Sequence, residues 1–219
     1  MARLFSHAQA ARFYDLLGAG LDTQAFYEAP ALDDLIAHLQ LGKCKAVVEF
    51  GSGTGRFAAE LLSNLPPSAT YLGLDMSTTM VGLAKSRLRP FGERANVVRT
   101  DGTAHIDAAD GTFDRFVSTY VFDLLSDDDI REVAYEARRV LRPDGLLGLV
   151  SLTDGPSLLS RLVTRTWRGL GSVSPWAVGG CRPITLLNFL PNAYWHIQYR
   201  TLIIRFGVPS EIVVARPVP

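Results

Sequence analysis

The 219-residue sequence contains few cysteines, no excess of either charge and no long apolar run. Its two cysteines, Cys44 and Cys181, are too few and too far apart for a metal cluster or a disulfide framework, so we expect no metal site and a reducing compartment. Lysine plus arginine and aspartate plus glutamate both number 22, which gives no general surface for nucleic acid. The composition therefore favours a small-molecule partner and argues against nucleic acid.

Signals for membrane insertion and export are also missing from the sequence. No apolar stretch reaches the roughly 20 residues that span a bilayer. The start, MARLFSHAQAARFYDLL, lacks the cationic region followed by an apolar run that marks a signal peptide. We therefore expect a soluble, cytoplasmic protein, and a chain of 219 residues suits a single domain.

Residues 47–150 alternate short β-branched runs with longer segments of helical period, a pattern typical of parallel strands joined by helical crossovers. We predict strands at residues 45–50, 70–75, 96–100, 113–119 and 146–152. Residues 194–217 predict two more strands around the turn FGVPSE, an antiparallel hairpin. The expected fold is α/β: a Rossmann-like, doubly wound, mostly parallel seven-stranded sheet with an antiparallel C-terminal hairpin and helices on both faces.

The chain divides into four parts along this fold: an N-terminal helical cap (1–43), a cofactor-binding core (44–153), a substrate-side insertion (154–192) and the C-terminal hairpin (193–219). The cap carries an apolar stripe of Leu32, Leu35, Ile36 and Leu39, which predicts either a lid over the sheet edge or a core helix. Within the core, Ser126 is placed to cap a helix that ends before Pro143.

The most informative segment is VVEFGSGTGRFAAELL, residues 47–62, in which Gly51, Gly53 and Gly55 separate a buried strand from a helix. Glycines permit a tight turn and the close approach of a ligand to the backbone. The amino end of the helix would offer unpaired N–H groups and a positive dipole. A carboxylate or a pyrophosphate could bind there.

Two acids narrow the choice of ligand. Asp75 follows Gly55 by 20 residues and ends the second strand, where it can accept hydrogen bonds from ribose hydroxyls, although it could also cap the next helix. The loop reads G-S-G-T-G-R and places Arg56 where a dinucleotide fingerprint needs a small residue, which disfavours NAD. Glu49 would repel a pyrophosphate but attract an ammonium group. The ligand should therefore carry both an ammonium and a carboxylate.

The ordered series EFGSGTG, GLDMSTTMVGLAK, TDGT, FDRFVST and RRVLRPDGLLGLVSL, within residues 45–153, resembles class I S-adenosylmethionine-dependent methyltransferases of the small-molecule, quinone-biosynthesis-like type. The resemblance implies S-adenosyl-L-methionine as cofactor and transfer of its methyl group to an O, N or C atom of a small organic acceptor. One departure is that Ile106, Asp107 and Ala108 replace the family's Leu-Pro-Phe segment.

The same resemblance implies a role for each matching residue. The methionine part of the donor would be held by Glu49, Gly51, Ser52, Gly53 and Gly55. Asp75 would bind the ribose and Met76 would pack on the adenine, which Asp101 and Gly102 would flank. Ser118, Thr119 and Tyr120 would line the pocket beside the methyl group, and Tyr14 would close over the donor.

The acceptor and the catalytic base stay open at this point. In-line displacement on a sulfonium depends mainly on alignment, and a base is needed only if the acceptor must lose a proton. Candidate bases are His7, His105, Tyr120, Asp123 and His196, and we assign no catalytic residue. The alternative functions are a donor-binding protein without turnover, and a methyltransferase for a lipid or quinone-like acceptor.

The segment after Leu152 bears on the acceptor. Arginines recur there at helical spacing among apolar residues: Arg161, Arg165 and Arg168, with Leu158, Leu159, Leu162, Val163 and Trp167. This pattern predicts either an amphipathic basic helix, which would receive an anionic or lipid-like acceptor or touch a membrane, or a packing helix with a solvated face.

Overall fold

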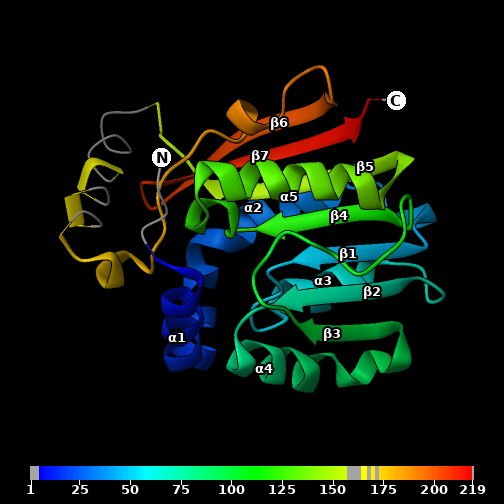
Figure 1. Ribbon diagram of the computed structural model, residues 1–219, viewed down its shortest axis with the longest axis horizontal. Coiled ribbons are helices and arrows are strands. Elements are labelled where there is room, and N and C mark those ends of the chain that lie inside the picture. The colour runs from blue at the N-terminus through cyan, green and yellow to red at the C-terminus, as the bar shows by residue number, and fades with distance from the viewer. Residues whose placement is uncertain (1–4, 157–163, 167–168, 171–172, 219) are drawn as a thin grey trace.

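The computed structural model describes residues 5–156, 164–166, 169–170 and 173–218 (Figure 1). Its centre is a seven-stranded sheet in the order β3-β2-β1-β4-β5-β7-β6. The strands are β1 (Ala46–Phe50), β2 (Thr70–Asp75), β3 (Ala95–Arg99), β4 (Phe113–Thr119), β5 (Leu141–Leu152), β6 (Trp195–Arg205) and β7 (Val208–Pro217). Strands β1 to β5 pair in parallel, whereas β7 runs antiparallel to β5 and β6. The predicted fold class is confirmed.

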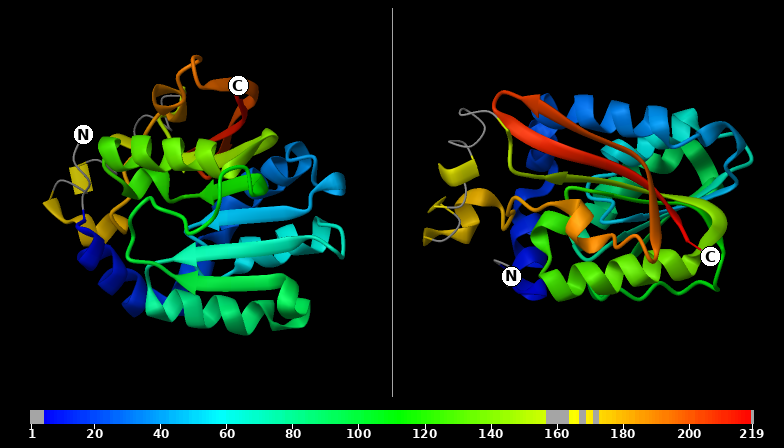
Figure 2. Two further views of the ribbon diagram at one scale, coloured as in Figure 1. Left: turned by 45° about the vertical axis from the view of Figure 1, so that its right-hand side comes forward. Right: turned by 90° about the horizontal axis from the view of Figure 1, so that it is seen from above.

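Helices cover both faces of this sheet (Figure 2). They are α1 (His7–Leu17), α2 (Ala25–His38), α3 (Arg56–Asn64), α4 (Thr78–Leu88) and α5 (Asp127–Val140). Consecutive strand residues point to opposite faces, so Val47 packs in the core beneath α2, α3 and α4, and Val48 packs in the core beneath α5. Burial on both faces explains why the parallel strands read as continuous apolar runs.

The start of α5 agrees with the sequence prediction in detail. Ser126 Oγ accepts the N–H of Asp129, and the Asp129 carboxylate accepts the N–H of Ser126, which forms a capping box. Three aspartates in the first turn complement the positive end of the helix dipole. The apolar face is buried against the sheet, with Ile130 and Val140 fully inaccessible to solvent.

The C-terminal hairpin is confirmed, but its turn is shorter than predicted. We expected a turn over FGVPSE, whereas Val208 to Glu211 already belong to β7 and the turn itself is Phe206–Gly207. Both turn residues have positive φ, 50° and 80°. Two consecutive left-handed residues match the twist of an antiparallel pair, so the strands continue to pair directly beside the turn.

The sequence left open whether the N-terminal region forms a lid over the sheet edge or packs in the core, and its two α-helices differ in this respect. Helix α2 is a core helix: Leu32, Leu35 and Leu39 are buried, and the helix packs on β5, β6 and β7. Helix α1 buries no residue fully and lies at the carboxyl end of the parallel strands, beside α4 (Figure 1). Helix α1 is therefore the part of the N-terminal region that can contribute to a site at this edge.

The predicted arginine-rich helix falls mostly outside the described residues. Arg161 and Arg168 lie outside them, as do Leu158, Leu159, Leu162, Val163 and Trp167. Arg165 is described as an exposed residue in helical conformation. Within the described part of the chain, no helix is both long and apolar enough to cross a membrane.

Candidate functional site

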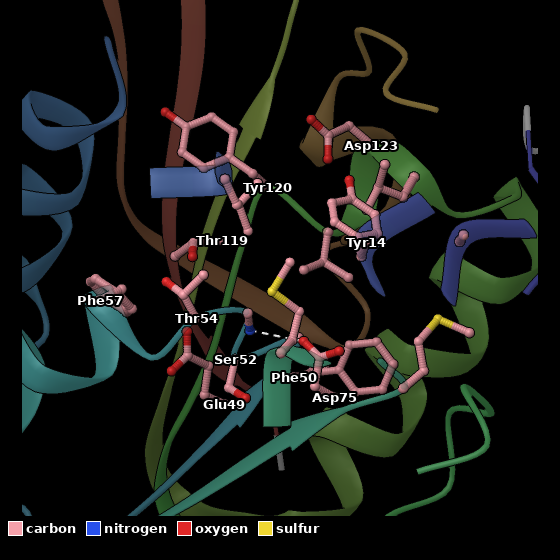
Figure 3. A pocket seen from close by; sticks show the side chains of 18 of the residues that line it. Tyr14, Glu49, Phe50, Ser52, Thr54, Phe57, Asp75, Thr119, Tyr120 and Asp123 are labelled. Carbon is pink, nitrogen blue, oxygen red and sulfur yellow. Dashed lines mark hydrogen bonds between the residues drawn. The ribbon is translucent and has the colours of Figure 1, made fainter. Parts of the chain in front are cut away.

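A pocket opens at the carboxyl edge of the sheet, where the loops after β1, β2, β3 and β4 meet α1 and α2 (Figure 3). The space in and around its open mouth, solvent included, amounts to about 1290 Å³. The described residues that line it include ten of those expected from the sequence: Tyr14, Glu49, Gly51, Ser52, Gly53, Asp75, Met76, Gly102, Thr119 and Tyr120. Gly55, Asp101 and Ser118 do not line it.

The glycines of the loop after β1 are required by close packing. Gly51 has φ +82°, and a Cβ there would lie 2.2 Å from Val121 Cγ2. Gly55 has φ +76° and precedes α3, and its Cβ would lie 2.9 Å from the Ala84 Cα. Gly51 thus keeps the loop against the pocket wall, whereas Gly55 allows α3 to approach α4.

One amide of this loop is engaged within the protein. Gly53 precedes the helix, which begins at Arg56, and its N–H donates to Asp75 Oδ2 at 2.8 Å. The N–H groups of Gly51 and Ser52 both donate to the Leu74 carbonyl. The left-handed turn at Gly53 directs its amide back toward β2, so Asp75 and the glycine loop are held together.

Two acids stand at neighbouring strand ends. Asp75 Oδ1 also accepts the Ser77 N–H at 2.9 Å, and burial raises the pKa of this carboxyl. Glu49 is 1% exposed and accepts a hydrogen bond from the Tyr71 hydroxyl. Burial raises the pKa of Glu49 from 4.5 to about 8, the Tyr71 hydrogen bond opposes the rise and the charge of Asp75 adds to it. Glu49 is therefore mostly protonated at neutral pH while the pocket holds no cation.

The pocket contains an unused polar atom beside these acids. Ser52 is buried, and its Oγ has no hydrogen-bond partner among the described residues. A buried hydroxyl without a partner costs free energy unless a ligand supplies one. Ser52 Oγ and Glu49 thus offer hydrogen-bonding capacity to the polar end of a ligand.

The β3 side of the pocket is apolar and closely packed. A Cβ at Gly102 would lie 2.7 Å from Met76 Cε and 3.5 Å from His7 Cγ, so these three residues adjoin. Asp101 points elsewhere: it is exposed, and its Oδ1 accepts the Thr103 N–H and hydroxyl. This wall fits a flat ring that packs on Met76.

The opposite end of the pocket is formed after β4. Figure 3 shows Tyr120 and Asp123 away from Glu49 and Ser52. Tyr120 has φ +55°, unusual for a non-glycine residue, and its hydroxyl shares a hydrogen bond with Ser210 Oγ. Ser118 is buried behind this wall, where its hydroxyl donates to the Phe50 carbonyl and fixes the ends of β1 and β4 together.

The structure separates the five candidate bases. His105 is largely exposed beside Glu136, and His196 is exposed on the edge strand β6; neither lines the pocket. His7 lines it at the Met76 and Gly102 wall. Tyr120 and Asp123 line the other end. Burial raises the pKa of the Tyr120 hydroxyl and raises that of Asp123 to about 7.

Charged residues that the sequence analysis missed complete the lining. Glu28 of α2 forms an ion pair with Arg56, and burial raises its pKa to about 7. Asp22 pairs with Arg87, which also donates to Thr54. The described lining therefore has five carboxyl groups against the single guanidinium of Arg56. In the sequence, Arg56 indicates only that the loop is unsuited to NAD, and no local pattern indicates Asp22 or Glu28 as site residues.

Comparison with known proteins identifies relatives of the core. Residues 47–145 match a family described as a methyltransferase domain. The chain is similar to arsenite methyltransferase of Aquipseudomonas alcaligenes, with 37% identity over 120 residues, 52% of this chain and 34% of that protein. It is also similar to demethylmenaquinone methyltransferase of Lactobacillus johnsonii, with 30% identity over 111 residues, 50% and 45% of the two chains. The chain thus spans less than half the length of these curated relatives.

Similarity to a solved structure extends over the whole chain. The crystal structure of the cyclase SpnF superposes with a TM-score of 0.74 at 18% identity, covering 100% of this chain and 99% of that one. At this identity the likeness concerns the fold alone. Because that protein is named a cyclase, the fold by itself does not fix the reaction.

Proposed function

We propose that the chain is a class I S-adenosylmethionine-dependent methyltransferase, as the sequence resemblance implies, and that it transfers the methyl group of S-adenosylmethionine to a small organic acceptor. The match of residues 47–145 to a methyltransferase domain supports this proposal. The observation that carries this proposal is the meeting of Glu49, Asp75 and the Gly51–Gly53 turn at one end of a single pocket.

The residues present fit the donor. Its ammonium, carboxylate and sulfonium groups give it one net positive charge at neutral pH, which suits a lining rich in carboxyl groups. In our proposal Glu49 binds the ammonium, and Ser52 and the glycine loop surround the amino-acid part. Asp75 accepts the ribose hydroxyls, while Met76 and Gly102 pack on the adenine. The donor supplies a methyl group already activated by the sulfonium charge.

The remaining residues of the expected set have supporting roles in this proposal. Gly55 and Ser118 position the loops that follow β1 and β4. Asp101 lies between Thr100 and Gly102, which both line the pocket, and stays a predicted edge contact of the adenine amino group. Thr119, Tyr120 and Tyr14 face the methyl group, and Tyr14 is anchored by donating to the Gly179 carbonyl at 3.3 Å.

The acceptor that suits this pocket is neutral and largely apolar. Phe5, Tyr27, Leu125 and Leu152 contribute apolar surface. An anionic acceptor would meet five carboxyl groups and one arginine that is already paired with Glu28. Of the acceptors considered from the sequence, we therefore retain the apolar, quinone-like class and drop the anionic one.

Calorimetry with adenosylhomocysteine and with NAD tests the donor assignment. We expect heat of binding with adenosylhomocysteine and none with NAD. Donor labelled in its methyl group, incubated with small-molecule extracts, should then yield a labelled product. Absence of binding to folded protein would refute the proposal, whereas binding without any labelled product would support a donor-binding protein without turnover.

A further inference from the structure

Asp123 is a buried carboxyl group that the donor assignment leaves unused. It lies in the short helix Phe122–Leu124 after β4, is 0% exposed and lines the pocket. Its Oδ2 accepts the Leu152 N–H at 3.3 Å, whereas its Oδ1 has no hydrogen-bond partner among the described residues. A buried carboxyl oxygen without a partner is costly, so its presence at a pocket wall points to a ligand atom.

The surroundings of Asp123 hold it in place without neutralising it. The Arg182 N–H donates to the Asp123 carbonyl, but the Arg182 guanidinium is directed to Leu125 and Asp127. Asp123 also interacts electrostatically with other titratable groups: Tyr14 of α1, Tyr27 and Glu28 of α2, Tyr120 after β4, and Cys181. Burial raises the pKa of each of these phenols and of the thiol, so they are neutral at physiological pH.

The alternatives at this end of the pocket are already engaged. The Tyr120 hydroxyl forms a hydrogen bond with Ser210 Oγ, and Glu28 forms an ion pair with Arg56. Within the described residues, Asp123 is thus the carboxyl group at the end of the pocket opposite Glu49 that has a fully buried oxygen without a hydrogen-bond partner. The walls around it are aromatic and aliphatic, which suits a planar acceptor with one ionisable group.

We infer that Asp123 is the general base of the reaction, and that the acceptor is a neutral, planar molecule with a phenolic or enolic hydroxyl. This inference rests on the proposed function. In the step, Asp123 Oδ1 takes the hydroxyl proton while the acceptor oxygen forms a bond to the methyl carbon. The carbon–sulfur bond breaks, and its electron pair stays on sulfur. The products are the methyl ether, adenosylhomocysteine and protonated Asp123, which returns its proton to solvent.

Two phenols of different acidity test this role. Phenol keeps its proton at about pH 8 and needs a base. 4-Nitrophenol is already ionised and needs none, although the carboxyl groups of the pocket should weaken its binding to wild type and variant alike. For Asp123→Asn we expect kcat/KM to fall by about 100-fold or more with phenol, and to change much less with 4-nitrophenol. Asp128→Asn, which alters an exposed carboxylate at the start of α5, is the matched control and should leave both rates unchanged.

Adenosylhomocysteine binding separates the possible failures. If the wild-type protein does not bind it, the proposed function itself fails. If binding is intact in both proteins but Asp123→Asn lowers both rates equally, or the wild type methylates neither phenol, only the inference about Asp123 is overturned. Asp123→Ala supplies a second test, because added formate should restore its activity with phenol if the lost group is a base.

Discussion

Replacing Glu49 by glutamine should make the stability of the ligand-free protein less dependent on pH. Between acid and neutral pH, the free energy of unfolding should fall less in the variant than in the wild type. The carboxyl is 1% exposed, and burial raises its pKa from 4.5 to about 8. Between these two values the group is ionised in the unfolded chain and protonated in the folded one. Folding therefore takes up a proton, and the free energy of unfolding falls as the pH rises through this window.

The size of the effect follows from the two pKa values of Glu49. From about pH 5 to pH 7.5, the wild-type protein should lose about 3 kcal/mol of stability through this group. Glutamine does not titrate, and its side-chain oxygen can still accept the Tyr71 hydrogen bond. Glu49→Gln should lack this loss, while other groups that titrate in the same window, such as Glu28 and Asp123, contribute equally to both proteins.

Urea unfolding of both proteins at the two pH values measures the difference. The quantity to compare is the change in unfolding free energy with pH, wild type against Glu49→Gln, because any packing cost of the substitution cancels in it. Adenosylhomocysteine should bind more weakly to Glu49→Gln than to the wild type, because the glutamine side chain cannot ionise and pair with the ammonium group of the ligand. Parallel pH profiles in the two proteins would refute a raised pKa of Glu49.

Three further substitutions test local contacts. Tyr71→Phe removes a hydrogen bond that lowers the pKa of Glu49, so adenosylhomocysteine affinity near neutral pH should fall by about tenfold or more in calorimetry. Gly51→Ala should destabilise the protein to urea by about 2 kcal/mol or more, because its Cβ meets the wall after β4. Its matched control Gly82→Ala, in an open position on α4, should stabilise by up to about 1 kcal/mol. Ser126→Ala should cost about 1 kcal/mol in the same assay through loss of the cap of α5.

The sheet and the position of the site at its carboxyl edge could be predicted from the sequence. Both depend on the local pattern of apolar residues and on the general rules by which parallel strands are connected. Parallel strands bring their carboxyl ends to one edge, so the sequence alone predicts that Glu49 and Asp75 meet there. The hairpin was predictable for the same reason, but its turn was not. The segment FGVPSE contains several turn-forming residues, and only strand pairing places the turn at Phe206–Gly207.

Features that depend on approach between distant segments could not be predicted. Whether the Gly53 amide is free depends on the position of Asp75, 22 residues later in the chain. The pairing of Glu28 with Arg56 depends on how α2 docks on the sheet, and many rotations of an apolar helix satisfy the same periodicity. The sequence could not distinguish Asp123 from the other four candidate bases, because the burial of Asp123 results from contacts with several elements of the fold.

These distant contacts also explain how the pocket can be rich in acids and remain stable when empty. Burial raises the pKa of Glu28 to about 7, of Glu49 to about 8 and of Asp123 to about 7, so at neutral pH a large share of their charge is absent. The cost of crowding ionised carboxylates in a low-dielectric space is thereby avoided. A cation entering the pocket favours the ionised forms, so the negative potential that holds it develops as it binds. Proton release on donor binding, larger in wild type than in Glu49→Gln, is the calorimetric consequence of this coupling.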